Sequence, residues 1–316
     1  MINTLKTIIV TGGAGFIGSH FLNTYVQKFP ETHFINIDSI TYAGDLSRID
    51  EEVEKSENYH FEKADIRDKS TLGEIYKKYN PTGTIHFAAE THVDRSIASP
   101  DIFLETNILG TKNLLDAHRE FATGRFHYVS TDEVYGDNPG DHFSVETDIL
   151  NPSSPYSASK ASAEMLLMSY GRTFHIDYTI SRGSNTYGKN QYPEKLIPYA
   201  LKCLNEGKKI GVYGDGENIR DWLSVEDHIG AIWEIFHRGK SGEIYNVGAN
   251  ALLSNNEIMH ILLELTGEDI SKIEYVSDRP GHDRRYALDT AKIESELGWK
   301  SESNFRESLK KLILSK

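Results

Sequence analysis

The sequence TIIVTGGAGFIGSH, residues 7–20, sets the fold of the first part of the chain. A short run of β-branched residues ends at Thr11, and Gly12, Gly15 and Gly18 lie in the turn that follows and at the start of an amphipathic helix. Glycines at this spacing permit a tight turn and let backbone N–H groups approach a pyrophosphate at the N-terminus of a helix. The same glycines could serve only to reverse the chain. The succession of strand, turn and helix favours a dinucleotide site.

An acidic residue at the end of the next predicted strand indicates which dinucleotide is bound. Asp38 lies twenty residues after Gly18, where a carboxylate can accept hydrogen bonds from both hydroxyls of the adenosine ribose. The same carboxylate would repel a 2′-phosphate, so NAD is favoured over NADP. Asp65 follows a further predicted strand and suits the adenine side of such a site.

The first 180 or so residues alternate between β-branched runs and amphipathic stretches, which is the pattern of parallel βαβ units. The predicted strands are 7–11, 33–38, 59–65, 83–89, 125–130 and 177–182. The predicted helices are clearest at 16–28, 69–79, 100–120 and 156–172. The expected fold class is α/β, with a Rossmann-like doubly wound parallel sheet.

After about residue 185 the composition changes to loops rich in Gly, Asn, Pro and aromatic residues, as in GSNTYGKNQYPEKLIP and VYGDGENIRDW. Loops of this composition often carry ligand sites. We therefore expect an NAD-binding Rossmann domain at 1–184 and a smaller mixed α/β substrate domain at 185–316. Part of 220–250 returns to the first domain in this prediction, because GEIYNVG at 242–248 has the composition of a sheet strand.

Composition and charge exclude several classes of protein. The 316 residues are 38% apolar and carry a net charge of −13, so a sizeable core is possible and non-specific binding to nucleic acid or an anionic membrane is disfavoured. No apolar run approaches the ~20 residues that span a bilayer, and the first residues lack the pattern of a signal peptide. Cys203 is the single cysteine, which excludes an internal disulfide framework and favours the cytoplasm.

A tyrosine and a lysine share one face of a predicted helix in NPSSPYSASKASAE, residues 151–164. Ser154 suits the N-cap and Pro155 suits the first helical position, so Tyr156 and Lys160 stand four residues apart within the first turns. A tyrosine hydroxyl with a pKa near ~10 is a poor base at neutral pH, but a nearby ammonium lowers that pKa. The two residues can be an exposed pair or an acid–base pair beside a nicotinamide, where the lysine could also hold the ribose.

A predicted strand ends in acidic residues in FHYVSTDEVYG, residues 126–136. Thr131, Asp132 and Glu133 follow the strand at once. Such an ending can be a solvated turn, or it can be the place where a parallel sheet presents reactive groups to a ligand. Two carboxylates in one apolar site can split their pKa values, so that one is protonated and the other is ionised.

The chain resembles the extended short-chain dehydrogenase/reductase family, whose members act on nucleotide sugars. The resemblance runs essentially from end to end and is carried by TGGAGFIGSH, TYAGDLS, AAETHVDRSI, STDEVYG, YSASK, YPEKLIP, YGDGENIRDW and RPGHDRRYA, which stand in the expected order. Within the family the residues are most similar to the nucleotide-sugar 4,6-dehydratases. That similarity implies an NAD-dependent hydro-lyase that takes dTDP-glucose and yields its 4-keto-6-deoxy sugar.

The resemblance assigns roles to five catalytic residues. Tyr156 takes the proton of the C4 hydroxyl as hydride leaves C4 for NAD, with Lys160 beside it. Thr131 hydrogen-bonds the C4 oxygen. Glu133 removes the C5 proton, Asp132 protonates the departing C6 hydroxyl, and the hydride returns to C6. On this view the acids after the strand are a site and not a turn.

The resemblance also places residues against the two small molecules. At the cofactor we expect Gly12, Gly15, Phe16, Ile17, Gly18, Asp38, Ser39, Thr41, Gly44, Asp65, Ile66, Ala88, Ala89, Thr106, Tyr156 and Lys160. At the nucleotide sugar we expect Glu90, Thr91, Thr131, Asn185, Lys195, Leu196, Tyr213, Arg220, Asn255, Arg279, His282, Asp283 and Tyr286. Arg220 and Arg279 offer planar cationic forks that suit a diphosphate.

No metal is expected, because His92 and His282 have no partners at metal-ligand spacing. A homodimer is expected, because the helices at 100–120 and 156–172 match those that form a dimeric bundle in relatives. No nucleic-acid or membrane partner is expected.

Several alternatives stay open at the level of sequence. UDP-glucose is an alternative substrate, because Thr186 stands where a second Asn is typical and Lys189 and Asn190 stand where Pro-Tyr is typical. A nucleotide-sugar 4-epimerase and a UDP-glucuronate decarboxylase are the nearest rival enzymes, and neither needs an acid pair after the threonine. A regulator that binds NAD without turnover would not need Tyr156 or Lys160.

Overall fold

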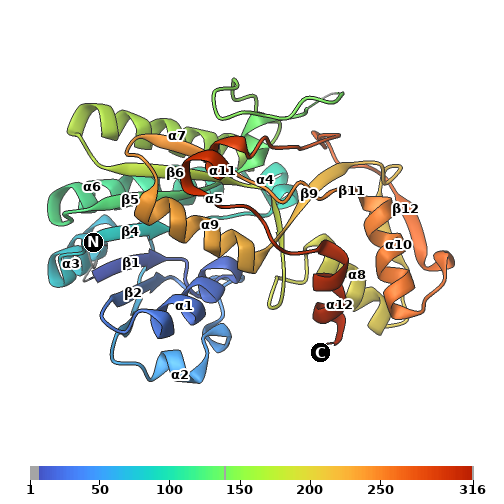
Figure 1. Ribbon diagram of the computed structural model, residues 1–316, viewed down its shortest axis with the longest axis horizontal. Coiled ribbons are helices and arrows are strands. Elements are labelled where there is room, and N and C mark those ends of the chain that lie inside the picture. Colours follow the sequence, from blue (N-terminus) through green and yellow to red (C-terminus); the bar gives the residue numbers. More distant parts are fainter. Residues whose placement is uncertain (1–6, 139, 315–316) are drawn as a thin grey trace. The chain divides into compact units, whose positions relative to one another are not determined.

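The computed structural model describes residues 7–138 and 140–314, which divide into two compact units (Figure 1). The first unit comprises the chain up to Thr131, Ser154–Arg182 and Ile232–Tyr245. The second comprises Asp132–Ser153, Gly183–Ala231 and the chain from Asn246 onward. Each unit is therefore assembled from segments that are distant in sequence.

Seven strands form the main sheet, in the order β10, β6, β5, β4, β1, β2, β3. Figure 1 labels β6, β5, β4, β1 and β2 in this order. Their bounds are β1 Thr7–Thr11, β2 His33–Asp38, β3 Tyr59–Lys63, β4 Gly83–His86, β5 Arg125–Thr131, β6 Tyr178–Gly183 and β10 Glu243–Val247. Strand β1 pairs in parallel with β2 and β4, β2 pairs with β3, and β4 pairs with β5. The chain order runs outward from β1 in both directions, so the predicted Rossmann-like α/β fold is confirmed.

The six strands predicted within the first 182 residues are all present. Strands β3 and β4 end earlier than expected, at Lys63 and His86. For β4 the reason is local packing, since the backbone of Ala88 lies against Gly12, where a Cβ would come within 2.6 Å of the Ala88 nitrogen. The chain must turn away from the sheet there to make room for the glycine turn.

The helices of the first unit follow the strands in sequence. Their bounds are α1 Phe16–Lys28, η1 Leu46–Arg48, α2 Glu51–Glu54, α3 Lys69–Tyr79, α4 Val93–Ala98, α5 Asp101–Phe103, η2 Leu104–Gly110, α6 Thr111–Phe121 and α7 Pro155–Phe174. Leu72 of α3, Leu114 of α6 and Leu167 of α7 are fully buried in one core together with Ile9 and Phe126 of the sheet. These side chains fix α7, and with it the predicted Tyr156 and Lys160 pair, against the strands.

The helix predicted at 100–120 changes its winding midway. Seven residues, Leu104–Gly110, form a π-helical segment between α5 and α6. A π turn holds one residue more than an α turn, and such segments are frequent at functional sites. Hydrophobic periodicity gives no sign of it, because the residues on either side keep the helical pattern.

The second unit contains two small sheets and a helical core. Its elements are η3 Asp132–Tyr135, β7 Asn185–Tyr187, α8 Leu196–Asn205, β8 Ile210–Tyr213, β9 Ile219–Ser224, the first half of α9 Val225–Arg238, β11 Leu252–Ser254, α10 Asn255–Thr266, η4 Ile270–Lys272, β12 Ile273–Val276, α11 Ala291–Leu297 and α12 Phe305–Leu314. Strand β9 pairs with β7 in parallel and with β11 antiparallel, and β12 pairs with β8 in parallel. Trp222, Met259 and Phe305 lie in the core of this unit. Within the described ranges, no helix has the length and apolar character that crossing a membrane requires.

Candidate active site

The turn between β1 and α1 and the first turn of α1 are packed so tightly that three glycines there admit no side chain. A Cβ on Gly12 would meet Ala88, one on Gly13 would meet Asn36, and one on Gly18 would meet the carbonyl oxygen of Gly12. Gly15 is the N-cap of α1 and provides no side-chain cap. The backbone N–H groups of the first turn, those of Phe16 and Ile17 among them, are therefore presented as a pyrophosphate requires.

Asp38 ends β2 beside this turn and is almost fully buried. Its Oδ2 accepts a 3.0 Å hydrogen bond from the backbone of Ala14, and Oδ1 accepts one of 2.8 Å from the backbone of Ile40. Burial raises the pKa of the carboxyl, while those two N–H donors and Arg48 oppose the rise. Each carboxylate oxygen retains a further lone pair, so the arrangement suits an adenosine ribose.

The loop after Asp38 contains a strained residue. Ile40 has a φ of 52°, in the left-handed region that β-branched residues rarely adopt. The hydrogen bond from its N–H to Asp38 holds it there. Ser39 and Thr41 flank this residue, and the nitrogen of Gly44 donates to the carbonyl oxygen of Thr41 at 3.1 Å. These expected cofactor residues thus form one compact turn with Asp38.

Asp65 lies in an ion pair on the surface. Its carboxylate accepts hydrogen bonds from Nη2 of Arg67 at 2.7 Å and from the backbone of Arg67 at 2.9 Å, which lower its pKa. Arg67 also contacts Glu105 at 3.1 Å. Ile66 is buried against Gly110, where a Cβ would come within 2.7 Å of its side chain. The expected cofactor contact of Asp65 stays a prediction.

Tyr156 and Lys160 are both buried, so the alternative of an exposed pair is wrong. Ser154 caps α7 through the backbone of Ser157 at 3.1 Å, and Pro155 is the first helical residue, as predicted. Nζ of Lys160 donates a 2.7 Å hydrogen bond to the carbonyl oxygen of Val129 on β5. Burial lowers the pKa of Lys160 to about 7, which puts its titration near neutral pH.

Asn107, within the π-helical segment η2, holds the loop after β4 and the start of α7 together. Its Oδ1 accepts a hydrogen bond from the backbone of Glu90 at 2.9 Å, and its Nδ2 donates to the carbonyl oxygen of Glu90 at 3.0 Å and to Oγ of Ser159 at 2.9 Å. Ser159 in turn donates to the carbonyl oxygen of Tyr156 at 2.6 Å. Sequence reasoning missed Asn107 and Ser159, whereas Thr106, beside Asn107, was expected.

The end of β5 is not a solvated turn. Ser130, Thr131 and Asp132 are all buried, and the 3-10 segment η3 begins at Asp132. Oγ of Ser130 is buried and makes no hydrogen bond to any described residue. A buried hydroxyl of this kind is expected where a ligand completes the hydrogen bonding. Together with the glycine turn and Asp38, it shows that the first unit fits a nicotinamide dinucleotide.

Glu133 lies in a part of the second unit where several positive charges act on its carboxyl. Burial raises the pKa of its carboxyl, and the positive charges of Arg279, Lys195 and Arg220 oppose the rise. Asp283 adds to it. The sequence placed these residues near one ligand only by resemblance, and their mutual electrostatic influence shows that the fold gathers them.

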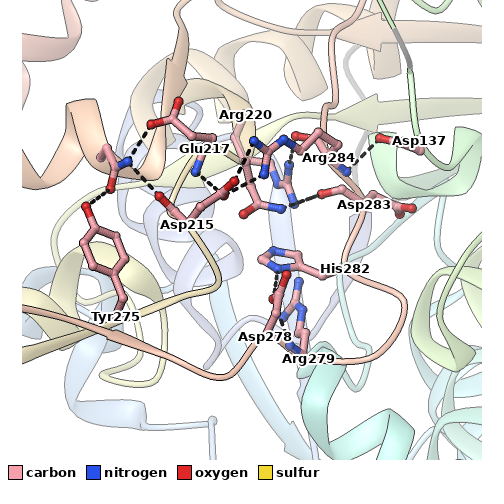
Figure 2. Close-up of polar contacts among 12 residues, drawn as sticks. Asp137, Asp215, Glu217, Arg220, Tyr275, Asp278, Arg279, His282, Asp283 and Arg284 are labelled. Carbon is pink, nitrogen blue, oxygen red and sulfur yellow. Dashed lines mark hydrogen bonds and ion pairs between the residues drawn. The ribbon is translucent and has the colours of Figure 1, made fainter.

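Arg220 of this cluster lies over the ring of Tyr286, and Figure 2 shows Arg220 together with Asp283 and Arg284. The guanidinium of Arg220 lies 4.3 Å from the ring centroid of Tyr286 and donates to the carbonyl oxygen of Asp283 at 2.8 Å. The Asp283 carboxylate accepts one hydrogen bond from the Tyr286 hydroxyl and another from Oγ of Ser153 at 2.6 Å. Ser153 was not predicted.

Hydrogen bonds and an ion pair hold the two ends of the loop that carries Arg279 and His282 (Figure 2). At its start Asp278 accepts hydrogen bonds from His282 at 2.6 Å and from the backbone of Arg279 at 2.8 Å. At its end Arg284 pairs with Asp215 at 2.7 Å. Burial lowers the pKa of His282.

The backbone N–H groups of Arg284 and Arg285 both donate to Oδ1 of Asp137, at 2.7 and 2.8 Å. Asp137 lies four residues after Glu133, so this contact joins the loop that carries Arg279 to the segment of the predicted base.

Five further expected substrate residues stand at the ends of elements of the second unit. Asn185 begins β7, Lys195 and Leu196 begin α8, Tyr213 ends β8 and Asn255 begins α10. The rings of Tyr213 and His282 lie 6.2 Å apart between centroids, edge to face. Among residues 7–138 and 140–314 no three His, Cys, Asp or Glu side chains gather as metal ligands would.

The two departures from the family pattern have structural accounts. Oγ1 of Thr186 donates to the carbonyl oxygen of Ser184 at 3.1 Å and lies 2.7 Å from Nδ1 of the buried His228. Asn190 has a φ of 66°, a conformation that asparagine tolerates better than most residues.

Comparison with known proteins identifies a family. The family model described as GDP-mannose 4,6 dehydratase matches residues 9–312. A dTDP-glucose 4,6-dehydratase of Salmonella typhimurium is 43% identical, over 97% of this chain and 91% of the relative.

Solved structures agree with this result. The crystal structure of a dTDP-glucose 4,6-dehydratase from Streptomyces venezuelae, with NAD and TYD bound, is 41% identical with a TM-score of 0.94 and covers 98% of this chain and 96% of its own. That of a dTDP-glucose 4,6-dehydratase from Bacillus anthracis, in complex with NAD, is 39% identical with a TM-score of 0.90 and covers 98% and 96%.

Proposed function

We propose that this chain, which belongs to the GDP-mannose 4,6 dehydratase family within the extended short-chain dehydrogenases/reductases, is an NAD-dependent hydro-lyase that converts dTDP-glucose to dTDP-4-keto-6-deoxyglucose. The observation that carries the proposal is the acid pair Asp132 and Glu133, which follows directly on the buried end of β5. The similarity to dTDP-glucose 4,6-dehydratases over nearly the whole chain supports it.

The first unit would hold the cofactor. Gly12, Gly15 and Gly18 suit the pyrophosphate, and Asp38 suits the adenosine ribose. When bound, NAD supplies a hydride acceptor and donor for the sugar. The carboxylate of Asp38 would repel the 2′-phosphate of NADP, which is why we propose NAD.

Tyr156, Lys160 and Thr131 would act at C4 of the sugar. Tyr156 takes the proton of the C4 hydroxyl, which a phenolate can do and a phenol cannot. The ammonium of Lys160 favours the phenolate by electrostatic attraction. The hydroxyl of Thr131 donates a hydrogen bond to the C4 oxygen and orients it.

Glu133 and Asp132 would remove water across C5 and C6. A C4 ketone makes the C5 proton acidic enough for a carboxylate to remove, and Asp132 gives a proton to the C6 hydroxyl as it leaves. A base works best when its pKa is near the operating pH, and burial raises the pKa of Glu133 in that direction.

Arg220, Arg279 and Lys195 would bind the diphosphate of the substrate. Arginine forks bind phosphate oxygens in a bidentate manner. This local positive charge offsets the net charge of −13, which would otherwise repel an anionic substrate.

A 4-epimerase is the second candidate function. It would use the same fold, the cofactor residues and Tyr156 with Lys160. It has no step for which an acid pair is needed, so Asp132 and Glu133 favour the dehydratase.

The proposal is tested by incubating the purified protein with dTDP-glucose and, separately, with UDP-glucose. A 4-keto-6-deoxy product from dTDP-glucose is the expected outcome. A C4 epimer in its place would assign the epimerase, and a faster reaction with UDP-glucose would correct the base specificity.

We further propose that the enzyme is a cytoplasmic homodimer. The two helices expected to form the dimer carry exposed apolar side chains, among them Leu104, Leu109 and Met165. The single cysteine is a buried thiol, which suits a reducing compartment. Light scattering on the purified protein gives the oligomeric state directly, and a monomer at working concentration would contradict the proposal.

A further inference from the structure

A buried ion pair lies one helical turn beyond Lys160 and has no part in the chemistry proposed above. Glu164 of α7 is 0% exposed and Arg182 of β6 is 2% exposed. Nε of Arg182 lies 3.2 Å from Oε1 and 3.1 Å from Oε2 of Glu164, and Nη2 lies 2.6 Å from Oε2. The guanidinium therefore binds both carboxylate oxygens and fixes the carboxylate in one orientation.

Stability alone gives no reason for such a pair. Removing two charges from water is costly, and well-packed apolar side chains of similar volume are often at least as stable. The pair therefore points to a role for the charge itself. The ionisable group of the proposed active site on the same helix face is Lys160, because residues four apart are neighbours on an α-helix.

The immediate contacts of Lys160 are uncharged. Nζ donates to the carbonyl oxygen of Val129 at 2.7 Å and lies 4.2 Å from the ring centroid of Tyr128. Burial holds the pKa of Tyr128 well above its usual value, so the Tyr128 ring faces the ammonium as a neutral phenol. Burial also lowers the pKa of Lys160 to about 7, and the charge of Glu164 opposes this fall.

The other ionisable groups around Lys160 do not supply the missing negative charge. His86 of β4 lies between Thr11, 2.7 Å from Nδ1, and Thr111, 3.0 Å from Nε2. Burial and the charge of Lys160 hold the pKa of His86 well below its usual value, so the ring is neutral at neutral pH. Tyr156 stands four residues before Lys160, and Arg182 is a cation already bound to Glu164.

We propose that Glu164 is a positioning residue for the reaction: held by Arg182, it favours the ammonium form of Lys160 near neutral pH. The inference rests on the proposed function in giving Lys160 a role beside Tyr156. Without the carboxylate, Lys160 would be a neutral amine near pH 7 and would no longer favour the Tyr156 phenolate. The ion pair would thus set the upper pH limit of the C4 chemistry without touching the substrate.

The protonation state of Lys160 can be measured directly. Protein carrying ¹³C at the lysine ε-carbons, and saturated with NAD, is titrated by NMR. The signal of Lys160 is assigned by its absence from Lys160→Met. In the wild type we expect a titration midpoint close to the value of about 7 noted above. In Glu164→Gln we expect the midpoint to fall by about one pH unit or more.

Three further variants separate charge from folding. Glu164→Asp keeps the charge and should retain most of the wild-type midpoint. The double variant E164L/R182M removes both charges and replaces them with apolar groups, which restores the fold if unpaired Arg182 destabilises Glu164→Gln. Leu167→Ala leaves a cavity on the same helix without changing a charge, so it should lower stability and leave the midpoint in place.

A lowered midpoint in Glu164→Gln and in the double variant, together with an alkaline limb of kcat that falls at lower pH, supports the inference. An unchanged Lys160 midpoint in the folded double variant would overturn it, whatever product the enzyme makes. Failure to form a 4-keto product from dTDP-glucose would overturn the proposed function and would leave the titration result standing, so the two failures are distinguishable.

Discussion

The positive charge of Arg279 acts on Glu133 against the effect of burial. Burial raises the pKa of the Glu133 carboxyl, and Arg279 gives the largest of the opposing contributions. The arginine that we assign to the diphosphate therefore also adjusts the strength of the predicted base.

Arg279→Gln should move the acid limb of the pH–rate profile to higher pH. Removing the positive charge raises the pKa of Glu133 further, so the carboxylate becomes protonated, and inactive as a base, at a higher pH than in the wild type. We expect a movement of about one pH unit in the kcat profile. Arg284→Gln is the matched control, because Arg284 pairs with the exposed Asp215. A profile that moves equally in both variants would show a non-specific charge effect.

Glu133→Gln should block elimination and leave the fold intact. Loss of a general base costs about 10²–10⁴-fold in rate, and reduced cofactor should accumulate on the enzyme after substrate is added. The absorbance of the reduced nicotinamide checks this. Glu217→Gln, at an exposed carboxylate bonded to Asn256, should behave as the wild type. Near wild-type turnover by Glu133→Gln would mean that another group is the base.

Asp38→Ala should weaken NAD binding by about 10- to 100-fold, since hydrogen bonds to a charged group each contribute about 1.5–3 kcal/mol. Titration calorimetry with NAD and with NADP measures both affinities. The wild type should prefer NAD, and the variant should lose the preference. Asp50→Ala, at the start of α2, controls for the loss of a nearby acidic residue. Equal binding of NAD and NADP by the wild type would refute the argument from Asp38.

The fold could be predicted because its signals are local. The turn after Thr11, the strand composition and the capping by Ser154 each depend on residues close in sequence, and the structure confirms them. For the candidate site, the sequence proposes residues but not their geometry. The gathering of Glu133 with Arg279 depends on contacts across some 150 residues of chain, which no local pattern encodes.

The buried ion pair near Lys160 is a second feature that the sequence does not predict. The spacing of Glu164 and Arg182 in the sequence does not predict an ion pair. The two residues belong to a helix and a strand, and only the packing of these elements brings them together. Ser130 is placed beside the nicotinamide by the family resemblance alone, and its burial without a hydrogen bond to any described residue is found only in the structure.

The titration of Lys160 should make the free energy of unfolding depend on pH. Its pKa is about 7 in the folded protein against 10.5 as the ordinary value, so between these pH values the unfolded chain binds more protons than the folded one. Stability should therefore rise with pH across this window, by at most ~1.4 kcal/mol per pH unit from this residue. Urea unfolding at pH 7 and pH 9 measures the rise.

Lys160→Met should lack that part of the rise. Because the other titrating groups are common to both proteins, the difference between variant and wild type isolates Lys160. A variant with the same pH dependence as the wild type would show that Lys160 is not deprotonated in the folded protein over this range.

Asn107 reaches Glu90 and Ser159 from a π-helical segment, so chain length determines the contact as much as residue identity does. Deleting one residue from Leu104–Gly110 would restore α-helical winding and rotate Asn107 by about 100° relative to one flank of the helix. Every side chain of the network would still be encoded, yet the loop after β4 would lose its anchor. The site is therefore more vulnerable to a frame-preserving deletion here than to most single substitutions, and sequence comparison must treat the residue count of this helix as an active-site property.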